Sequence, residues 1–309
     1  MCGIIGLHLR DPALRPELGR LLDDMLCGVS ERGPDSVGVA VYGDETRNPP
    51  GQEAVSVLRA PGDLDRAVAA LLFGRRSGAE LDPGRGRPAV TATPAGDTTV
   101  LTAPVGGEAL AAAVHAAAPD ALVVGRGDDV VVYKGAGHPS DLARTYGLRD
   151  VAGWQGLAHT RMATESAINP EGCHPYSVGP NQCLVHNGSF SNHATIRREL
   201  VRQGVTFDSE NDTEVGARFV AACLAEGDDL EKALLRLGET FDGFYTLLVT
   251  TADGFAVVRD EIACKPAVIA EHPRWVAMAS EFRALAELPG IGEARIFEPD
   301  PGRVYTWRR

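Results

Sequence analysis

The spacing of apolar positions changes twice within the first 43 residues. Residues 3–9 form an almost unbroken apolar run, which is typical of a buried strand, whereas residues 17–27 place leucine and methionine side chains at helical spacing behind a proline. A second apolar run at 37–42 follows a Gly-Pro-Asp turn. The pattern predicts a strand, a helix that closes at Gly28, and a second strand.

From residue 154 onward, short apolar runs alternate with longer amphipathic segments. The expected strands are 154–159, 182–187, 243–251, 254–259, 266–270, 275–279 and 303–307, and the expected helices are 192–203, 213–226 and 229–238. The helices are grouped between runs of strands instead of following each strand in turn. We therefore expect packed antiparallel sheets with helical outer layers.

Residues 44–150 have a different character, with segments rich in glycine, proline and arginine. Within them we expect helices near 63–73 and 107–118 and short strands near 54–59, 98–103 and 121–133. This region is expected to be an inserted α/β subdomain of unknown role that interrupts a main domain of residues 2–309. An arginine cluster at Arg75, Arg76, Arg85 and Arg87 is either a docking surface or a solvated loop.

The composition and charge of the chain argue against several functional classes. The chain has 309 residues, of which 44% are hydrophobic and 23% charged, and this balance is typical of a globular protein. Its formal net charge of -12 opposes binding to nucleic acids and to anionic membranes. No apolar run approaches the ~20 residues of a membrane span. Six irregularly spaced cysteines predict reduced thiols, and we expect a cytoplasmic protein.

Cys2 stands directly behind the initiator methionine. Removal of Met1 would place a thiol and a free α-amine on one residue. An α-amine titrates near pH ~8, so close to neutral pH a fraction of it is unprotonated and accepts the thiol proton. The sequence thus predicts a nucleophile that carries its own base, and a chain that retains Met1 is expected to be inactive. The alternative is a small, half-buried cysteine at the start of a strand.

Four further segments are polar and glycine-rich between strand-like flanks, which is where ligand-contacting loops tend to lie. They are 32–36, 158–165, 184–189 and 210–215. Each of these segments alone also fits a structural role, as a turn, a surface arginine or a helix cap.

Taken together, the functional groups in these segments are complementary to a single ligand. The planar guanidinium of Arg161 suits a carboxylate, and the carboxylate of Asp212 suits an ammonium group. The amide of Asn187 and the backbone N–H of Gly188 can hold a developing oxyanion beside Cys2. An α-amino acid with a side-chain amide, glutamine or asparagine, has this set of groups.

The same motifs resemble, in order along the chain, those of the class II glutamine amidotransferases. The matching segments are Cys2-Gly3-Ile4-Ile5-Gly6, Arg32-Gly33-Pro34-Asp35-Ser36, His159-Thr160-Arg161-Met162-Ala163-Thr164, His186-Asn187-Gly188 and Asn211-Asp212-Thr213-Glu214-Val215. Arg259-Asp260 through Lys265-Pro266, and Ala279-Ser280-Glu281 with Ala284-Leu285, resemble later strands of that family. The resemblance covers nearly all of the chain except 44–150.

The resemblance implies an α+β fold of four layers, α, β, β and α, known as the N-terminal-nucleophile hydrolase fold, here with the inserted α/β subdomain. It implies that Cys2 is the nucleophile and that Asn187 and Gly188 form the oxyanion hole. It assigns the substrate α-carboxylate to Arg161 and the α-amine to Asp212.

The resemblance also implies that Thr164 and Gly188 complete the glutamine pocket and that Arg32 lies near the nucleophile. Whether Arg32 contacts the thiol stays open. Met162 and Glu165 stand where many relatives carry tryptophan and histidine. The lid over glutamine is therefore expected to differ in packing and charge.

Within the family, the pattern is most similar to the stand-alone amidotransferase subunits of glutamate-synthase-like enzymes, such as methylglutamate synthase and the split archaeal glutamate synthases. This implies that ammonia released from glutamine passes to separate synthase subunits in a hetero-oligomer. The sequence shows no phosphate-binding glycine loop and no binding motif for a nucleotide, flavin or iron–sulfur cluster, so no cofactor is expected.

Four other readings stay open at this point. The first three are a stand-alone glutaminase, a non-catalytic subunit that senses glutamine or scaffolds a complex, and a hydrolase of other amides. A zinc site at Cys173, His174, Cys183 and His186 is the fourth, but its spacing is irregular and we expect no metal.

Overall fold

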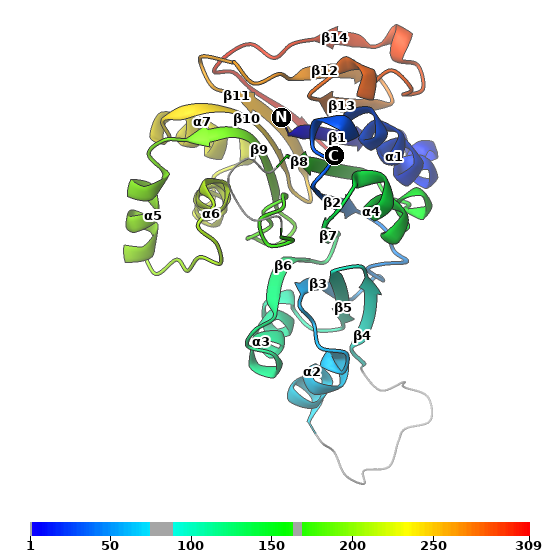
Figure 1. Ribbon diagram of the computed structural model, residues 1–309, viewed down its shortest axis with the longest axis vertical. Coiled ribbons are helices and arrows are strands. Elements are labelled where there is room, and N and C mark those ends of the chain that lie inside the picture. Colours follow the sequence, from blue (N-terminus) through cyan, green and yellow to red (C-terminus); the bar gives the residue numbers. More distant parts are fainter. Residues whose placement is uncertain (1, 75–88, 163–168) are drawn as a thin grey trace.

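Two antiparallel sheets lie face to face at the centre of the molecule (Figure 1). The computed structural model describes residues 2–74, 89–162 and 169–309. The larger sheet has the strand order β14-β12-β13-β1-β8-β2-β7, and the smaller has β15-β11-β10-β9. Every strand pairing in these described ranges is antiparallel, as expected from the grouping of the predicted elements.

The two sheets bury a common core. The larger sheet consists of β1 (Gly3–Leu9), β2 (Ser36–Tyr42), β7 (Val130–Ala136), β8 (Gln155–Arg161), β12 (Val268–His272), β13 (Trp275–Ala279) and β14 (Arg295–Phe297). The smaller sheet consists of β9 (Cys183–Phe190), β10 (Gly243–Thr250), β11 (Gly254–Arg259) and β15 (Val304–Arg308). Ile4 and Leu157 of the larger sheet belong to one buried cluster with Val185 and Leu248 of the smaller sheet. These side chains seal the interior between the sheets.

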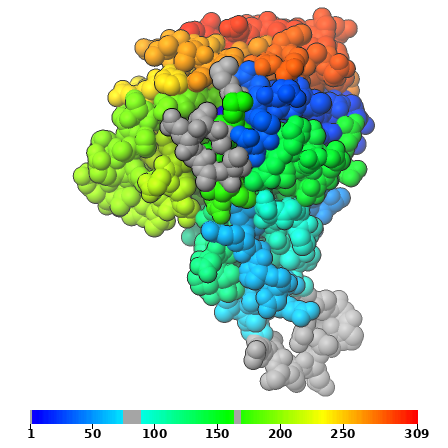
Figure 2. Space-filling model, in the orientation of Figure 1, coloured from blue at the N-terminus to red at the C-terminus, as the bar shows by residue number. Residues whose placement is uncertain are grey.

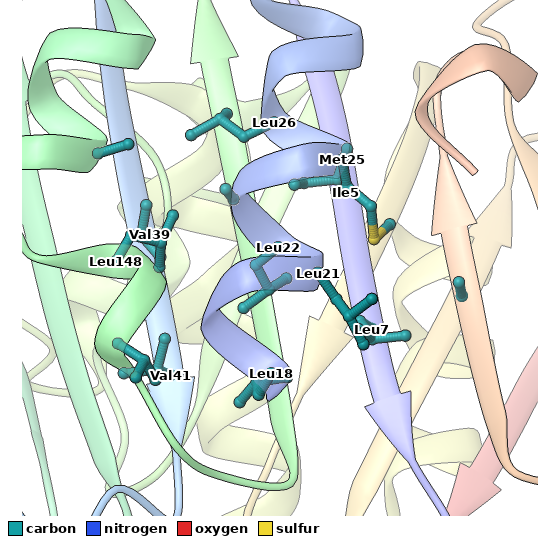
Figure 3. Packing of buried hydrophobic residues seen from close by; sticks show 14 of the residues in the cluster. Ile5, Leu7, Leu18, Leu21, Leu22, Met25, Leu26, Val39, Val41 and Leu148 are labelled. Carbon is teal, nitrogen blue, oxygen red and sulfur yellow. The ribbon is translucent and has the colours of Figure 1, made fainter. Parts of the chain in front are cut away.

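Helices cover both outer faces. On the larger sheet lie α1 (Leu18–Val29) and α4 (Pro139–Thr145), and on the smaller sheet lie α5 (His193–Arg202), α6 (Asp212–Ala225) and α7 (Leu230–Thr240) (Figure 1). Figure 3 shows Leu18, Leu22 and Leu26 of α1 pointing onto the strands beneath. Short 3-10 turns occur at Pro12–Glu17, Ser30–Arg32, Leu148–Asp150, Phe282–Ala284 and Ile291–Glu293. The four layers of the N-terminal-nucleophile hydrolase fold are thereby confirmed.

Gly28 does not close α1, contrary to the sequence expectation. The helix continues to Val29, and Ser30 follows as its C-cap residue. A Cβ atom at Gly28 would lie 2.7 Å from the Cα of Ala284. The glycine therefore allows close contact between the helix and the turn that follows β13.

A third sheet with its own core projects from this body (Figures 1 and 2). Its strand order is β4-β5-β3-β6, and its elements are β3 (Glu53–Leu58), α2 (Leu64–Phe73), β4 (Thr91–Ala95), β5 (Thr98–Ala103), α3 (Gly107–Ala117) and β6 (Leu122–Gly127). The element order βαββαβ and this strand order are those of a ferredoxin-like split βαβ unit. The third sheet is thus an inserted α/β unit.

The third sheet covers a shorter range than the expected insertion of 44–150. The single strand expected at 121–133 is two strands that belong to different sheets, because β7 pairs with β2 in the larger sheet. Helix α4 also packs on that sheet. In the described part of the chain, no helix combines the length and the apolar character needed to cross a lipid bilayer.

Candidate active site

Cys2 directly precedes β1, a central strand of the larger sheet, and is half-buried. The start of β1 is held by side chains from two neighbouring segments. The backbone N–H of Gly3 donates to Thr160 Oγ1 at 3.1 Å, and the N–H of Ile4 donates to Ser280 Oγ at 2.9 Å. Because alternate residues of a strand face the same side, Cys2 shares the face of Ile4, which looks toward the smaller sheet.

Arg32 positions the backbone of the candidate nucleophile. Its Nε donates to the carbonyl oxygen of Cys2 at 3.0 Å, and its Nη1 lies 2.5 Å from a carboxylate oxygen of Glu281. The Glu281 carboxylate in turn has a lowered pKa, because Arg32 hydrogen bonds to it. The sequence left open whether Arg32 contacts the thiol. The structure places its hydrogen bond on the Cys2 carbonyl.

Asn187 and Gly188 lie on β9 of the facing sheet. Asn187 Nδ2 donates to the Cys2 carbonyl oxygen at 3.1 Å, and Asn187 Oδ1 lies 3.2 Å from His159 Nε2. Gly188 has a φ of +142°, and a Cβ atom there would lie 2.0 Å from the carbonyl oxygen of Phe244. Only glycine fits this position. The structure therefore brings Asn187 against the backbone of the predicted nucleophile, and Gly188 is the next residue of β9.

His159 is a site residue to which the sequence reasoning gave no role. Burial alone would raise the pKa of the Cys2 thiol, but a hydrogen bond and the charge of His159, together with a backbone hydrogen bond at Met162, lower it to about 6. A thiol with this pKa is largely thiolate at neutral pH. The available signal was the position of His159 two residues before Arg161 in a predicted strand.

Arg161 ends β8, beside the start of β1. Gly3 pairs with Thr160, so Arg161 is the next residue along β8 at the level of Cys2. Its backbone carbonyl accepts a hydrogen bond from the N–H of Asp35 at 3.2 Å. A guanidinium nitrogen of Arg161 lies 3.1 Å from where a Cβ on Gly172 would stand. The side chain therefore reaches the loop that leads into β9.

Asp212 is tied to the end of β9. The structure assigns the N-cap of α6 to Asn211, whose Oδ1 accepts from the backbone N–H of Thr213 at 2.9 Å, so Asp212 is not the cap. One oxygen of Asp212 accepts from the N–H of Phe190 at 2.8 Å, and the other lies 4.0 Å from His186 Nδ1. The carboxylate is thus anchored two residues beyond Gly188.

Two buried histidines share one hydroxyl behind this site. His174 Nε2 and His186 Nδ1 each lie 2.9 Å from Thr213 Oγ1. Burial lowers the pKa of His186 to about 4 and holds that of His174 well below its usual range, so both rings are neutral at pH 7.

These contacts also bear on the zinc alternative. The thiol of Cys173 donates to backbone carbonyls of Gly135 and Asn169. Among residues 2–74, 89–162 and 169–309, no three His, Cys, Asp or Glu side chains are placed to hold a metal ion. Thr164, Glu165 and the arginine cluster at 75–87 lie outside the described residues, as does Met1.

Comparisons with known proteins agree with this geometry. Residues 159–287 match a family model described as a glutamine amidotransferase domain. The chain is 47% identical over 307 residues to the glutamine amidotransferase-like protein GlxB of Rhizobium meliloti, which covers 99% of this chain and 98% of that relative. It is also 30% identical over 188 residues to an amidophosphoribosyltransferase of Methanocaldococcus jannaschii, covering 58% of this chain and 40% of that protein.

A solved structure shares the fold. The glutamine phosphoribosylpyrophosphate amidotransferase of B. subtilis superimposes with a TM-score of 0.60 at 17% sequence identity. The match covers 99% of this chain and 47% of that one, so the chain spans about half the length of the solved protein. The near full-length likeness to GlxB decides the family. The chain belongs to the class II glutamine amidotransferases, enzymes that act on the side-chain amide of glutamine.

Proposed function

We propose that this chain hydrolyses glutamine to glutamate and ammonia through a γ-glutamyl thioester on Cys2, and that it supplies the ammonia to a separate glutamate-synthase-like partner. The observation that carries the proposal is the arrangement around Cys2. Its carbonyl accepts hydrogen bonds from both Arg32 and Asn187, and its thiol has a pKa lowered to about 6. A positioned thiolate beside an amide donor is suited to attack on a carbonyl carbon.

The reaction proceeds in two halves. The Cys2 thiolate attacks the glutamine δ-carbon, while the Asn187 side-chain amide and the Gly188 backbone N–H stabilise the oxyanion. The α-amine of the processed Cys2, which has taken the thiol proton, returns that proton to the leaving nitrogen, so that ammonia leaves and the γ-glutamyl thioester remains. Water then attacks the thioester, with the α-amine of a processed Cys2 as base, and glutamate is released.

The substrate is held at both ends of its amino-acid group. We assign the α-carboxylate to Arg161, because this residue lies at the level of Cys2 on the neighbouring strand and carries a planar guanidinium. We assign the α-ammonium to Asp212, whose carboxylate is fixed at the end of the strand that carries Asn187. Thr164 remains the predicted third contact.

A separate acceptor chain is inferred from the resemblance of the motifs at 159–166 and 186–189 to those of stand-alone amidotransferase subunits of glutamate-synthase-like enzymes. Under this proposal the reaction belongs to nitrogen metabolism in the cytoplasm, the location predicted from the sequence.

Glutamate release from glutamine by the purified chain tests the hydrolysis. We expect Cys2→Ser to abolish it and Asn187→Ala to lower turnover ~10²-fold or more, because the Asn187 amide donor acts on charge that develops in the transition state. Cys27→Ser changes an exposed thiol on the outer helix α1 and is the control. Full activity in either site variant would contradict the proposal.

The acceptor is tested separately, by purifying the tagged chain from its own cells and identifying bound chains by mass. We expect a partner that consumes ammonia and becomes glutamine-dependent in the complex. A chain that is active but binds no partner would contradict the acceptor and leave the hydrolysis standing.

A further inference from the structure

We propose that Thr213 is a positioning residue for substrate specificity, because its hydroxyl holds the Asp212 carboxylate in the orientation that receives the α-ammonium of the substrate. His174 and His186 in turn hold that hydroxyl. This inference rests on the proposed assignment of the α-ammonium to Asp212. It gives a role to a residue of the fourth polar segment to which the sequence pattern assigned none.

Three polar groups surround the Thr213 hydroxyl. His174 Nε2 and His186 Nδ1 each lie 2.9 Å from Oγ1, and Oδ1 of Asp212 lies 3.4 Å from it. A hydroxyl has one hydrogen to donate and two positions that accept. The three contacts can therefore be satisfied together only if one partner accepts and the other two donate.

The direction of each hydrogen bond follows from the carboxylate. An ionised carboxylate only accepts, so Thr213 Oγ1 donates its hydrogen to Asp212. Both imidazoles then donate to Oγ1, His174 from Nε2 and His186 from Nδ1. Both rings are neutral at pH 7, because burial lowers the pKa of each, so each ring carries a single N–H and uses it here.

The remaining ring nitrogens agree with these tautomers. His174 Nδ1 and His186 Nε2 are buried and have no hydrogen-bond partner in the described part of the chain. If Thr213 donated to either ring instead, that ring would carry its hydrogen on the unpartnered nitrogen. A buried N–H without an acceptor is costly, and the hydrogen bond to Asp212 would be lost as well.

This arrangement holds Asp212 at both carboxylate oxygens. The backbone N–H of Phe190 donates to Oδ2 at 2.8 Å, and the Thr213 hydroxyl donates to Oδ1. The two donors come from different elements, strand β9 and helix α6, so the carboxylate cannot turn without breaking one of these bonds. The Asp212 side chain is 19% exposed, which leaves part of it open to a ligand ammonium.

Packing keeps the three supporting side chains in place. Thr213 is 1% exposed, and His174 and His186 are buried. The His186 ring stacks on Phe190 with ring centroids 4.4 Å apart, and the His174 ring packs edge-on against His159 at 4.1 Å. Thr213 therefore acts on the substrate only through Asp212.

A fixed carboxylate has a consequence for specificity. A carboxylate that rotates freely loses that freedom when it binds an ammonium group, whereas one that is already held does not. The Thr213 hydroxyl should therefore strengthen the binding of ligands that carry an α-amine and leave the binding of ligands without one unchanged.

The test compares two ligands that differ only in the α-amine, L-glutamine and 4-carbamoylbutanoate. Their dissociation constants are measured by isothermal titration calorimetry on the full chain in a Cys2→Ser background, so that neither ligand is hydrolysed. We expect Thr213→Val to weaken glutamine binding about tenfold or more and to change the binding of 4-carbamoylbutanoate less than about twofold. Thr213→Ser keeps the hydroxyl and should retain the preference for the amine.

Thr213→Ala also lacks the hydroxyl and favours a helix, so it is measured in parallel, and thermal unfolding checks that each variant is folded. The matched control is Thr195→Val, which removes an exposed hydroxyl from the first turn of another outer helix, α5. It should leave both dissociation constants unchanged.

Equal weakening of both ligands, or glutamine binding that does not change in either variant without the hydroxyl, would overturn the proposal. A chain that binds neither ligand would overturn both this inference and the proposed function. If the preference for the amine depends on Thr213 but the chain with Cys2 releases no glutamate, the proposed hydrolysis fails while the positioning role of Thr213 stands.

Discussion

Hydrogen bonds to the backbone hold the candidate nucleophile in place. Two donors from different parts of the chain, Arg32 and Asn187, meet on the carbonyl of Cys2. The next two N–H groups are accepted by the hydroxyls of Thr160 and Ser280. A residue at the end of a strand would otherwise be free to fray. Here four hydrogen bonds fix the backbone of residues 2–4, so the position of the Cys2 backbone is set before any ligand arrives.

The backbone of Gly188 gives a prediction at the same scale. Gly188→Ala meets two costs, a left-handed φ of +142° and a Cβ that would lie 2.0 Å from a backbone oxygen of β10. We expect a loss of more than ~3 kcal/mol in unfolding free energy and a fall in glutamate release of ~10²-fold. Urea unfolding and the glutaminase assay measure both.

Gly204→Ala is the matched control for that change. Gly204 also has a positive φ, of +91°, but nothing lies within 4 Å of its Cβ position. Conformational strain alone should cost ~1–2 kcal/mol there and leave activity intact. Equal losses in the two variants would show that the clash with β10 is not what makes Gly188 necessary.

At the scale of elements, a pH prediction concerns the histidines that join the loop before β9, strand β9 and helix α6. Burial lowers the folded-state pKa of His186 to about 4, below the ordinary 6.5. Between these values the unfolded chain binds a proton that the folded chain does not. Stability is therefore fully present above about pH 6.5 and is lost as the pH falls toward 4.

Urea unfolding at several pH values between 4 and 7.5 measures this dependence. His174 adds to it with the same sign, because burial also lowers its pKa. In His186→Gln we expect the slope to fall by up to about 1.4 kcal/mol per pH unit, the contribution of one proton. His115→Gln removes an exposed ring and should keep the wild-type slope. An unchanged slope in His186→Gln would mean that His186 is protonated in the folded state.

Most elements were predictable from the sequence because their apolar periodicity is local. The helices at 193–202, 212–225 and 230–240 lie within one or two residues of their expected ends. The sequence-based prediction was wrong where a tertiary contact determines the end of an element. The local pattern predicts a helix end at Gly28. The glycine is instead needed for close contact with Ala284, which is far away in the sequence.

The same distinction between local sequence pattern and tertiary contact applies to the site. The motifs singled out Cys2, Asn187 and Asp212 as candidates, and the structure brings Asn187 against the carbonyl of Cys2. Which residue caps α6 was not predictable, because Asn211 and Asp212 are both good caps and only the fold directs Asp212 to the end of β9. The role of His159 needs the register of two paired strands, which composition and spacing do not reveal.

At the scale of the whole molecule, the third sheet is joined to the body through the outer edge of β7. β7 ends the larger sheet, so its outward backbone groups need partners from elsewhere. Ser56 Oγ accepts from the N–H of Val132 at 3.0 Å. Thr98 Oγ1 accepts from the N–H of Lys134 at 2.9 Å and donates to its carbonyl at 3.0 Å. Side-chain hydroxyls of the inserted unit thus take the place of a neighbouring strand.

The last prediction tests that junction. Thr98→Val keeps the shape of the side chain but leaves the N–H and the carbonyl of Lys134 buried without partners, which should cost ~2–5 kcal/mol of unfolding free energy. Hydrogen exchange at the Lys134 amide should accelerate as well. Thr99→Val, on the other face of the same strand, replaces a half-exposed hydroxyl and should cost less than ~0.5 kcal/mol. If both variants lose the same stability, the third sheet is held by its apolar contacts and not by the hydroxyl of Thr98.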